Sequence, residues 1–340
     1  MMLKKSKFLG IGSYLPPRVV KNDDLAKIMD TSDEWIQERT GIKQRHWVDG
    51  STSTSDLALV ASERAIENAG IHKKEIDLII FATLSPDHDF PGTACFLQAK
   101  LDLPGIPALD IRQQCSGFLY GLSIADQFIK TGAAKKVLLV GAEVHSKGLD
   151  KSNEGREVSV LFGDGAGAAI IGDCDEGSTG TEMDSQIFST HIHADGSFAK
   201  ELWVPGPGMA TDGERLTLER MEAGDHFPKM NGKTVFVNAC KRMPEVILEA
   251  LKANRKTIDD VDLFMFHQAN LRINQMVAKQ LHIPEEKVFN TIQNYGNTTA
   301  ATIPIGLADA VKAGKLKKGM LVASAAFGSG FTWSGALFRW

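Results

Sequence analysis

The sequence predicts an α/β protein of two similar halves, each with a mostly parallel, five-stranded sheet. Stretches with helical spacing of apolar residues alternate with short, wholly apolar stretches, which is typical of strands covered on both faces. The second half also repeats parts of the first 182 to 185 positions later: residues 75–81 resemble 260–266, and residues 135–140 resemble 317–322. This period is too long for a solenoid and indicates two packed α/β units.

Length and composition limit the possible classes of protein. The chain has 340 residues, 24% of them charged, and a net charge of -4, so nothing marks it as a binder of nucleic acid. It has no run of 18 apolar residues, and its basic N-terminus lacks the apolar stretch of a signal peptide. Its four cysteines form neither a CxxC pair nor a metal-binding spacing. We therefore expect a cytoplasmic protein in a reducing compartment, without membrane attachment, bound metal or a disulfide scaffold.

The N-terminal region is expected to begin with a strand at residues 8–12, which two prolines break. Asn22 or Asp23 would cap a short helix that reaches Met29. A second helix is expected to begin at Thr31, with an acidic residue three positions later as in a capping box.

This second helix carries Trp35, and Arg39 follows four positions later. The two side chains could hold a nucleotide by stacking and by charge. Trp35 is explained equally well as an ordinary core residue, so both interpretations stay open at this point.

The next elements alternate between helix and strand. They are expected at residues 55–69, 78–83, 93–101 and 137–141. The glycine-rich run at 162–168 could suggest a phosphate-binding loop, but no helical pattern follows it. We therefore favour close-packed strands with a tight turn, because a phosphate loop needs a strand–loop–helix context.

Cys115 lies where an apolar strand turns into a helix. The apolar positions of that helix are Phe118, Leu122, Ala125 and Ile129. Backbone N–H groups without a helical partner point outward at such a place, which lowers a thiol pKa from about 8.5 and can hold an oxyanion. Cys115 is then a candidate nucleophile; the other interpretation is a small buried apolar residue.

The internal repeat brings two further residues to Cys115. A shift of 182 positions leads from Cys115 to Asn297, so both precede equivalent helices. His267 follows an apolar strand, as Ala82 does in the first half. Because ligands bind at the carboxyl ends of strands in open α/β sheets, we expect Cys115, His267 and Asn297 to converge on one pocket. A single His at a strand end is more often structural, and this convergence favours the functional interpretation.

Residues 195–233 do not fit the repeat. They are rich in Pro and Gly, and we expect a short helix at residues 217–221. Two interpretations stay open: a lid or binding loop, and a surface insertion of no functional consequence.

Taken in order, these motifs resemble the β-ketoacyl-acyl carrier protein synthase III family of the thiolase-like superfamily. The resemblance runs nearly end to end, except at residues 200–228. It rests on residues 31–36, 39–42, 115–118, 162–167, 267–272, 296–298 and 331–333. The resemblance implies a thiolase-like, duplicated α-β-α-β-α sandwich, usually a homodimer. Its expected parts are an N-terminal half (1–175), a connection with an insertion (176–233) and a C-terminal half (234–340).

The resemblance also implies an acyltransferase that needs no cofactor. Cys115 would take an acyl group from acyl-CoA and condense it with malonyl-acyl carrier protein, with loss of carbon dioxide, in fatty-acid initiation or a related biosynthesis. His267 and Asn297 would donate hydrogen bonds to the enolate that forms, so no general base is needed. A thiolase would need a second catalytic cysteine, and none follows Cys240.

Further residues match positions with binding roles in this family. Trp35, Arg39, Arg156 and Asn270 match positions that bind CoA. Phe90 matches a residue that lines the acyl pocket across the dimer.

Two positions depart from the family pattern. Lys43 and Arg272 match basic positions near the carrier-protein docking surface, but Lys43 stands where an Arg is expected. The backbone N–H groups of Cys115 and Ser329 would form the oxyanion hole, and Ser329 stands where a glycine is usual. Because that donor belongs to the main chain, a serine can serve there if its backbone angles are allowed.

Other functions stay open. One alternative is an acyl-CoA condensing enzyme of the same superfamily that is non-decarboxylative or makes a secondary metabolite. A non-decarboxylative enzyme would need a base such as Asp87 or Asp89. A catalytically silent binding subunit is another, although an intact Cys–His–Asn set argues against it. We also expect Phe90 and the insertion at 200–228 to set the acyl chain length, and to favour a longer or bulkier acyl group than acetyl.

Overall fold

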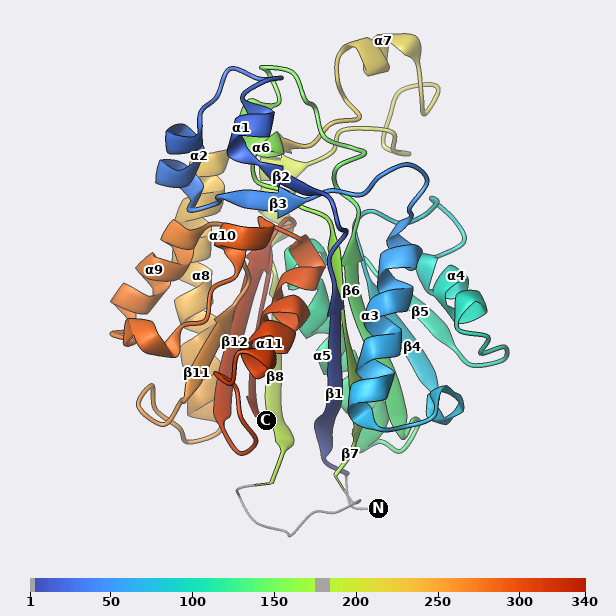
Figure 1. The fold of residues 1–340 in the computed structure, drawn as a ribbon, viewed down its shortest axis with the longest axis vertical. Coiled ribbons are helices and arrows are strands. Elements are labelled where there is room, and N and C mark those ends of the chain that lie inside the picture. Colours follow the sequence, from blue (N-terminus) through green and yellow to red (C-terminus); the bar gives the residue numbers. More distant parts are fainter. Residues whose placement is uncertain (1–3, 175–183) are drawn as a thin grey trace.

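Two sheets packed around central helices make up the fold (Figure 1). The structure is a computed structural model, and it describes residues 4–174 and 184–340. In the first sheet, β7 pairs antiparallel with β1 and β6, whereas β4 lies parallel to β6 and β5. In spatial order its strands are β1 (Ser6–Tyr14), β7 (Gly165–Asp173), β6 (Lys136–Glu143), β4 (Leu78–Ala82) and β5 (Ala108–Ile111).

The second sheet has four strands among the described residues. In spatial order they are β11 (Leu263–Phe266), β12 (Leu321–Gly328), β13 (Thr332–Arg339) and β8 (Gln186–Ala194). The expected fifth strand is reduced to one bridge between Phe264 and Val288. Soon after that bridge, the side chain of Gln268 accepts the N–H of Thr291 at 3.0 Å, so the chain turns away instead of extending the pairing. The prediction of five strands is therefore wrong for the second half.

The sheets are mixed, and the prediction of mostly parallel sheets is also wrong. In the two main sheets of the described chain, three strand pairs are parallel and four are antiparallel. The reason lies in the connections: β13 follows β12 after three residues, too few for the crossover that parallel strands require.

Helices form three layers around the two sheets, which confirms the duplicated α-β-α-β-α sandwich. The central helices α5 (Gly117–Lys130) and α11 (Thr302–Lys312) share one apolar core with both sheets. The outer helices are α3 (Thr54–Ala69), α4 (Thr93–Lys100), α8 (Gly232–Ala253) and α9 (Leu271–Gln280). Burial of both faces explains why the strands read as apolar runs.

The two halves agree closely where the repeat predicts functional residues. β4 ends at Ala82, and its counterpart β11 ends one residue before His267. Gln114 precedes Cys115 with φ 43°, and Gly296 precedes Asn297 with φ 65°. A positive φ is uncommon for a residue other than glycine, so Gln114 marks a constrained turn directly before the candidate nucleophile.

The first helices begin and end a few residues away from the predicted positions. α1 (Asn22–Leu25) ends well before Met29. The cap of α2 (Asp33–Thr40) is Ser32 rather than Thr31, because the Ser32 hydroxyl accepts the N–H of Trp35 at 3.1 Å. Likewise, α3 begins at Thr54 behind a Ser53 cap. Neighbouring Ser and Thr residues compete for the same cap, and spacing alone does not distinguish them.

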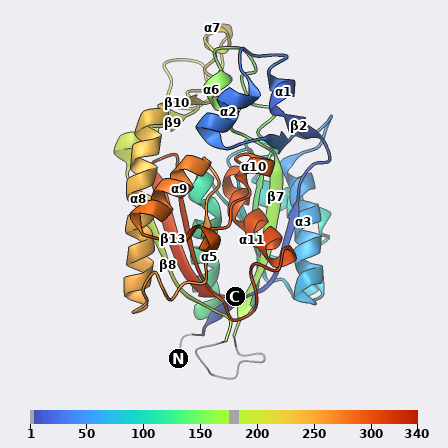
Figure 2. The ribbon, with the colours of Figure 1, turned by 60° about the vertical axis from the view of Figure 1, so that its left-hand side comes forward.

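Short elements complete the described chain. The short strands and α-helices are β2 (Val19–Lys21), β3 (Gln44–His46), α6 (Arg156–Ser159), β9 (Leu202–Trp203), α7 (Leu218–Glu222), β10 (Lys229–Met230) and α10 (Ile292–Tyr295). The 3₁₀ turns are η1 (Lys73–Glu75), η2 (Gln114–Ser116), η3 (Gly196–Glu201), η4 (Glu285–Lys287) and η5 (Thr299–Ala301). Helix α7, capped by Thr217, is the short helix expected at 217–221. It lies at the same end of the molecule as α2 and α6 (Figures 1 and 2). The division of the chain at 175/176 and 233/234 stays a prediction.

Candidate active site

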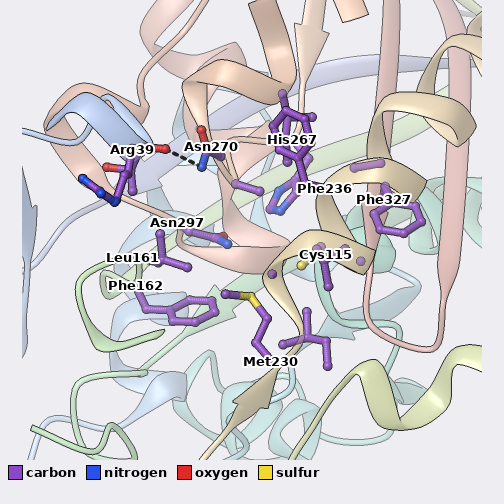
Figure 3. Close-up of a pocket in the computed structure, with 18 of the residues that line it drawn as sticks. Arg39, Cys115, Leu161, Phe162, Met230, Phe236, His267, Asn270, Asn297 and Phe327 are labelled. Carbon is purple, nitrogen blue, oxygen red and sulfur yellow. Dashed lines mark hydrogen bonds between the residues drawn. The ribbon is translucent and has the colours of Figure 1, made fainter. Parts of the chain in front are cut away.

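One cavity of about 340 Å³ brings together the three residues that the repeat predicts. Cys115, His267 and Asn297 all line it, although they are far apart in the sequence. Figure 3 shows the His267 ring and the Asn297 amide directed toward the space beside Cys115. The volume is within the usual range for a small-molecule site.

Cys115 is held in the η2 turn directly before α5 and is only 6% exposed. Burial raises the pKa of the Cys115 thiol to about 12, and the nearby Glu143 carboxylate adds to this effect. The backbone N–H groups of Cys115 and Ser329 face the sulfur and act in the opposite direction. Burial therefore opposes the lowered pKa that the turn before a helix predicts.

Gly328 allows the β12 backbone to approach Cys115 closely. A Cβ built at position 328 would lie 2.5 Å from the Cys115 Cβ and 2.8 Å from its Sγ. Cβ atoms in proteins essentially never approach other heavy atoms more closely than 3.0 Å. Only glycine therefore fits at position 328 unless the backbone or Cys115 moves. Because residue 328 has no side chain, the backbone N–H of the next residue, Ser329, can lie close to the Cys115 sulfur.

His267 is 2% exposed and is fixed by one side-chain partner. Its Nδ1 lies 2.7 Å from the hydroxyl oxygen of Thr302, and that hydroxyl donates to the carbonyl oxygen of Thr299 at 3.0 Å. Nδ1 is thus engaged by Thr302, whereas Nε2 has no hydrogen-bond partner among the described residues. Burial lowers the pKa of His267 to about 3, which keeps the ring neutral near pH 7.

Asn297 is held by the glycine-rich segment of the other half. Its N–H donates to the carbonyl of Leu161 at 2.8 Å, and its carbonyl accepts the N–H of Gly163 at 3.1 Å. Its side-chain oxygen accepts the N–H of Thr299 at 2.8 Å, which fixes the amide orientation and leaves the NH₂ group as a donor. The glycine run therefore makes a close backbone contact and leads into β7, as its favoured interpretation predicts.

Sequence reasoning missed Glu143, a fully buried carboxylate at the end of β6. It accepts hydrogen bonds from the Thr83 and Ser85 hydroxyls and from the N–H groups of Leu84 and Ser85. Burial raises the pKa of Glu143 to about 7, while these donors act in the opposite direction. The residue holds the loop after β4 against β6, and no motif in the sequence signals it.

The expected CoA-binding residues gather at one side of the cavity. The guanidinium carbons of Arg39 and Arg156 lie 4.6 Å and 4.8 Å from the centre of the Trp35 ring. Asn270 donates to the carbonyl oxygen of Arg39 at 2.9 Å and so joins α9 to α2 (Figure 3). Trp35, Arg39 and Asn270 line the cavity. Arg156 is not part of the lining but contacts the Trp35 ring.

Other expected residues lie outside the cavity lining. Phe90 is 84% exposed, and Lys43 and Arg272 are exposed on the surface. Asp87 accepts the N–H and hydroxyl of Ser55, and Asp89 forms an ion pair with Arg215 of the insertion. Asp87 and Asp89 are therefore engaged in structural contacts within this chain.

The insertion contributes to the cavity through its base. Leu202 in β9 and Met230 in β10 line the cavity, whereas Met209 and Leu218 are exposed. Four apolar residues of α8 that line the cavity were also not predicted from the sequence. Their helical spacing could have indicated that they share one face of the helix. They are Val235, Phe236, Ala239 and Met243.

Metal-binding clusters and membrane-spanning helices are features that other classes of protein would need. Within residues 4–174 and 184–340, no group of three or more His, Cys, Asp or Glu side chains is placed to hold a metal ion. Over the same residues, no helix combines the length and apolar character needed to cross a membrane.

Known protein families match this chain along most of its length. The family described as 3-Oxoacyl-[acyl-carrier-protein (ACP)] synthase III matches residues 109–196, and the C-terminal family of the same name matches residues 251–340. A protein of Ehrlichia canis named Beta-ketoacyl-[acyl-carrier-protein] synthase III is 47% identical over 337 residues, which cover 99% of this chain and 100% of that protein.

Solved structures agree with the sequence relatives. The crystal structure of 3-oxoacyl-[acyl-carrier-protein] synthase III from Aquifex aeolicus VF5 has a TM-score of 0.87 and 43% identity, and the match covers 98% of this chain and 100% of that one. The priming β-ketosynthase of the R1128 polyketide biosynthetic pathway has the same TM-score at 30% identity, with 99% and 97% covered. The nearer of these two in sequence is thus the acyl-carrier-protein enzyme.

Proposed function

Because this chain belongs to the 3-oxoacyl-[acyl-carrier-protein] synthase III family and is an acyl-condensing enzyme, we propose that Cys115 carries the acyl group that it condenses. The acyl donor is an acyl-CoA, and the second substrate is malonyl-acyl carrier protein, which loses carbon dioxide. The product is a 3-oxoacyl thioester, formed in fatty-acid initiation. The observation that carries this proposal is the meeting of Cys115, His267 and Asn297 in one cavity, with two backbone N–H groups at the sulfur.

In the first half-reaction, the thiol of Cys115 attacks the thioester carbonyl. The thiol is protonated at rest, so it loses its proton to water before the thiolate forms the new carbon–sulfur bond. The N–H groups of Cys115 and Ser329 hold the oxyanion. When the bond to the CoA sulfur breaks, that sulfur takes up a proton from water, so the half-reaction consumes no proton overall.

In the second half-reaction, the carbon–carbon bond to the malonyl carboxylate breaks and carbon dioxide departs. The electron pair left behind forms an enolate, whose oxygen accepts hydrogen bonds from Asn297 and His267. For His267 to donate, Nε2 carries the ring proton and Nδ1 accepts the hydroxyl of Thr302. The enolate carbon then attacks the acyl carbonyl, and the Cys115 sulfur leaves and takes up one proton from solvent.

Trp35, Arg39 and Arg156 form the proposed site for the CoA nucleotide. An adenine ring can stack on the Trp35–Arg surface, and both guanidinium groups can pair with phosphate. Asn270 fixes Arg39 from α9 and closes the side of the passage to Cys115. No cofactor takes part in this chemistry, since the first half-reaction exchanges one thioester for another and the departing carboxyl group supplies the electron pair for the second.

The proposed partner surface and assembly follow from exposed features. Lys43 and Arg272 are exposed cations, and an acidic carrier protein would dock on them. Strand β5 is one of the two edge strands of the first sheet and offers a pairing site for a second copy, which supports a homodimer with Phe90 near its two-fold axis. Light scattering at micromolar concentration checks the dimer, and a monomer would contradict it.

The proposed location of the protein is the cytoplasm.

A non-decarboxylative reaction would need a base beside Cys115. Glu157 is the carboxylate that lines the cavity, and it is exposed on α6 next to Arg156, on the proposed CoA side. Asp87 and Asp89 are held by Ser55 and Arg215. Glu143 lies near Cys115, but it is not among the residues that line the cavity, and the hydroxyls of Thr83 and Ser85 bind its carboxylate. These placements favour decarboxylation over proton abstraction.

Peptide mapping after incubation with a panel of acyl-CoAs tests the proposal. We expect a mass increase of one acyl group on the peptide that contains Cys115. Cys115→Ser should abolish it and leave malonyl decarboxylation measurable. An acyl group on Cys95, Cys174 or Cys240 instead would show that the nucleophile is misassigned.

A further inference from the structure

Three hydroxyl groups link the nucleophile turn to the insertion. Ser116, the neighbour of Cys115, donates to the carbonyl of Thr332 at 3.1 Å, and the Thr332 hydroxyl donates to the carbonyl of Ser329 at 3.1 Å. The Ser329 hydroxyl in turn donates to the carbonyl of Leu202. Each donor is a side chain and each acceptor is a backbone carbonyl, so the chain of contacts holds main-chain positions.

The final acceptor belongs to the hairpin at the base of the insertion. Leu202 pairs with Met230 in the β9–β10 hairpin, and both side chains line the cavity. The backbone N–H of Ser329, the residue that bonds to Leu202, faces the Cys115 sulfur. Ser329 therefore contacts the cavity wall with its hydroxyl and the reacting sulfur with its backbone.

We propose that Ser329 is a positioning residue, whose hydroxyl ties the oxyanion-hole N–H to the β9–β10 hairpin. The inference rests on the proposed function and adds a role for a side chain that the oxyanion hole itself does not use. The hairpin that touches bound substrate through Leu202 and Met230 then also sets the position of the donor. Glycine at position 329 has no hydroxyl and would leave that N–H tied only through Thr332.

This role predicts different effects on the two half-reactions. The Ser329 N–H would stabilise the oxyanion formed when the acyl group moves to and from Cys115. The enolate of malonyl decarboxylation instead uses His267 and Asn297. Loss of the hydroxyl should therefore slow acyl transfer and spare decarboxylation, whereas general damage to the fold would slow both.

The test compares Ser329→Ala with Ser329→Thr in the full-length protein. Single-turnover acylation of Cys115 by octanoyl-CoA is followed by intact-protein mass spectrometry, and carbon dioxide release from malonyl-acyl carrier protein is followed separately. We expect about tenfold slower acylation for Ser329→Ala, less than the 10²–10³ typical for complete loss of an oxyanion donor. Decarboxylation should stay within about twofold of wild type, and Ser329→Thr should restore most of the acylation rate.

Ser197→Ala is the matched control. The Ser197 hydroxyl lies on η3, just before the same hairpin, but bonds to Asp195 on the surface at 2.6 Å, so both rates should match wild type. Wild-type acylation by Ser329→Ala would overturn the inference, and so would an equal loss in both reactions. A wild-type protein that never acylates Cys115 is a separate result, and it would overturn the proposed function.

Discussion

Gly328→Ala should displace the nucleophile without removing any functional group. The added Cβ would lie 2.5 Å from the Cys115 Cβ, 2.8 Å from its Sγ and 3.2 Å from its N. Carbon atoms in contact are normally about 3.5–4.0 Å apart, so the backbone and Cys115 must separate by roughly 1 Å. A displacement of this size at a reacting centre costs about 10²-fold in rate.

The assay is the single-turnover rate of Cys115 acylation, with Gly196→Ala as control because no atom lies within 4 Å of a Cβ at that position. We expect about a hundredfold loss for Gly328→Ala and wild-type behaviour for the control. Carbon dioxide release from malonyl-acyl carrier protein should fall much less. If folded Gly328→Ala acylates Cys115 within about threefold of wild type, the close approach of β12 is not what aligns the sulfur and its donors.

Three further predictions use the same assays. His267→Ala and Asn297→Ala should each spare acylation and slow decarboxylation about 10²–10³-fold; labelled carbon dioxide released at the wild-type rate would refute this. Because burial raises the pKa of Cys115 to about 12, its thiolate fraction grows with pH, and iodoacetamide alkylation should accelerate about tenfold per unit from pH 7 to 10. A plateau before pH 9 would show that the helix terminus outweighs burial. Octanoyl-CoA should acylate Cys115 faster than acetyl-CoA, and replacing residues 206–226 by a short Gly-Ser turn should lower that ratio. An unchanged ratio in a folded protein would leave the insertion a structural role only.

The sequence was informative where local pattern and the repeat act together. The shift from Cys115 to Asn297, and the match between Ala82 and His267, predict that three distant residues meet at one cavity. The apolar spacing of Phe118, Leu122, Ala125 and Ile129 likewise predicts the buried face of α5.

Features set by long-range contact could not be read in this way. The single bridge between Phe264 and Val288 depends on the Gln268 side chain capturing a backbone N–H, which no period reveals. The link between Ser329 and Leu202 joins positions 127 apart. The pKa of Cys115 also depends on how completely its turn is covered, which the local sequence does not reveal.

The most direct measurement of the central claim follows both products of one turnover. The protein is first acylated with octanoyl-CoA, freed of excess CoA ester, and then mixed with malonyl-acyl carrier protein carrying a labelled free carboxyl group. The account predicts one labelled carbon dioxide and one 3-oxodecanoyl-acyl carrier protein for each acyl group lost from Cys115. Loss of the acyl group with no labelled carbon dioxide, or condensation that retains the carboxyl label, would contradict it.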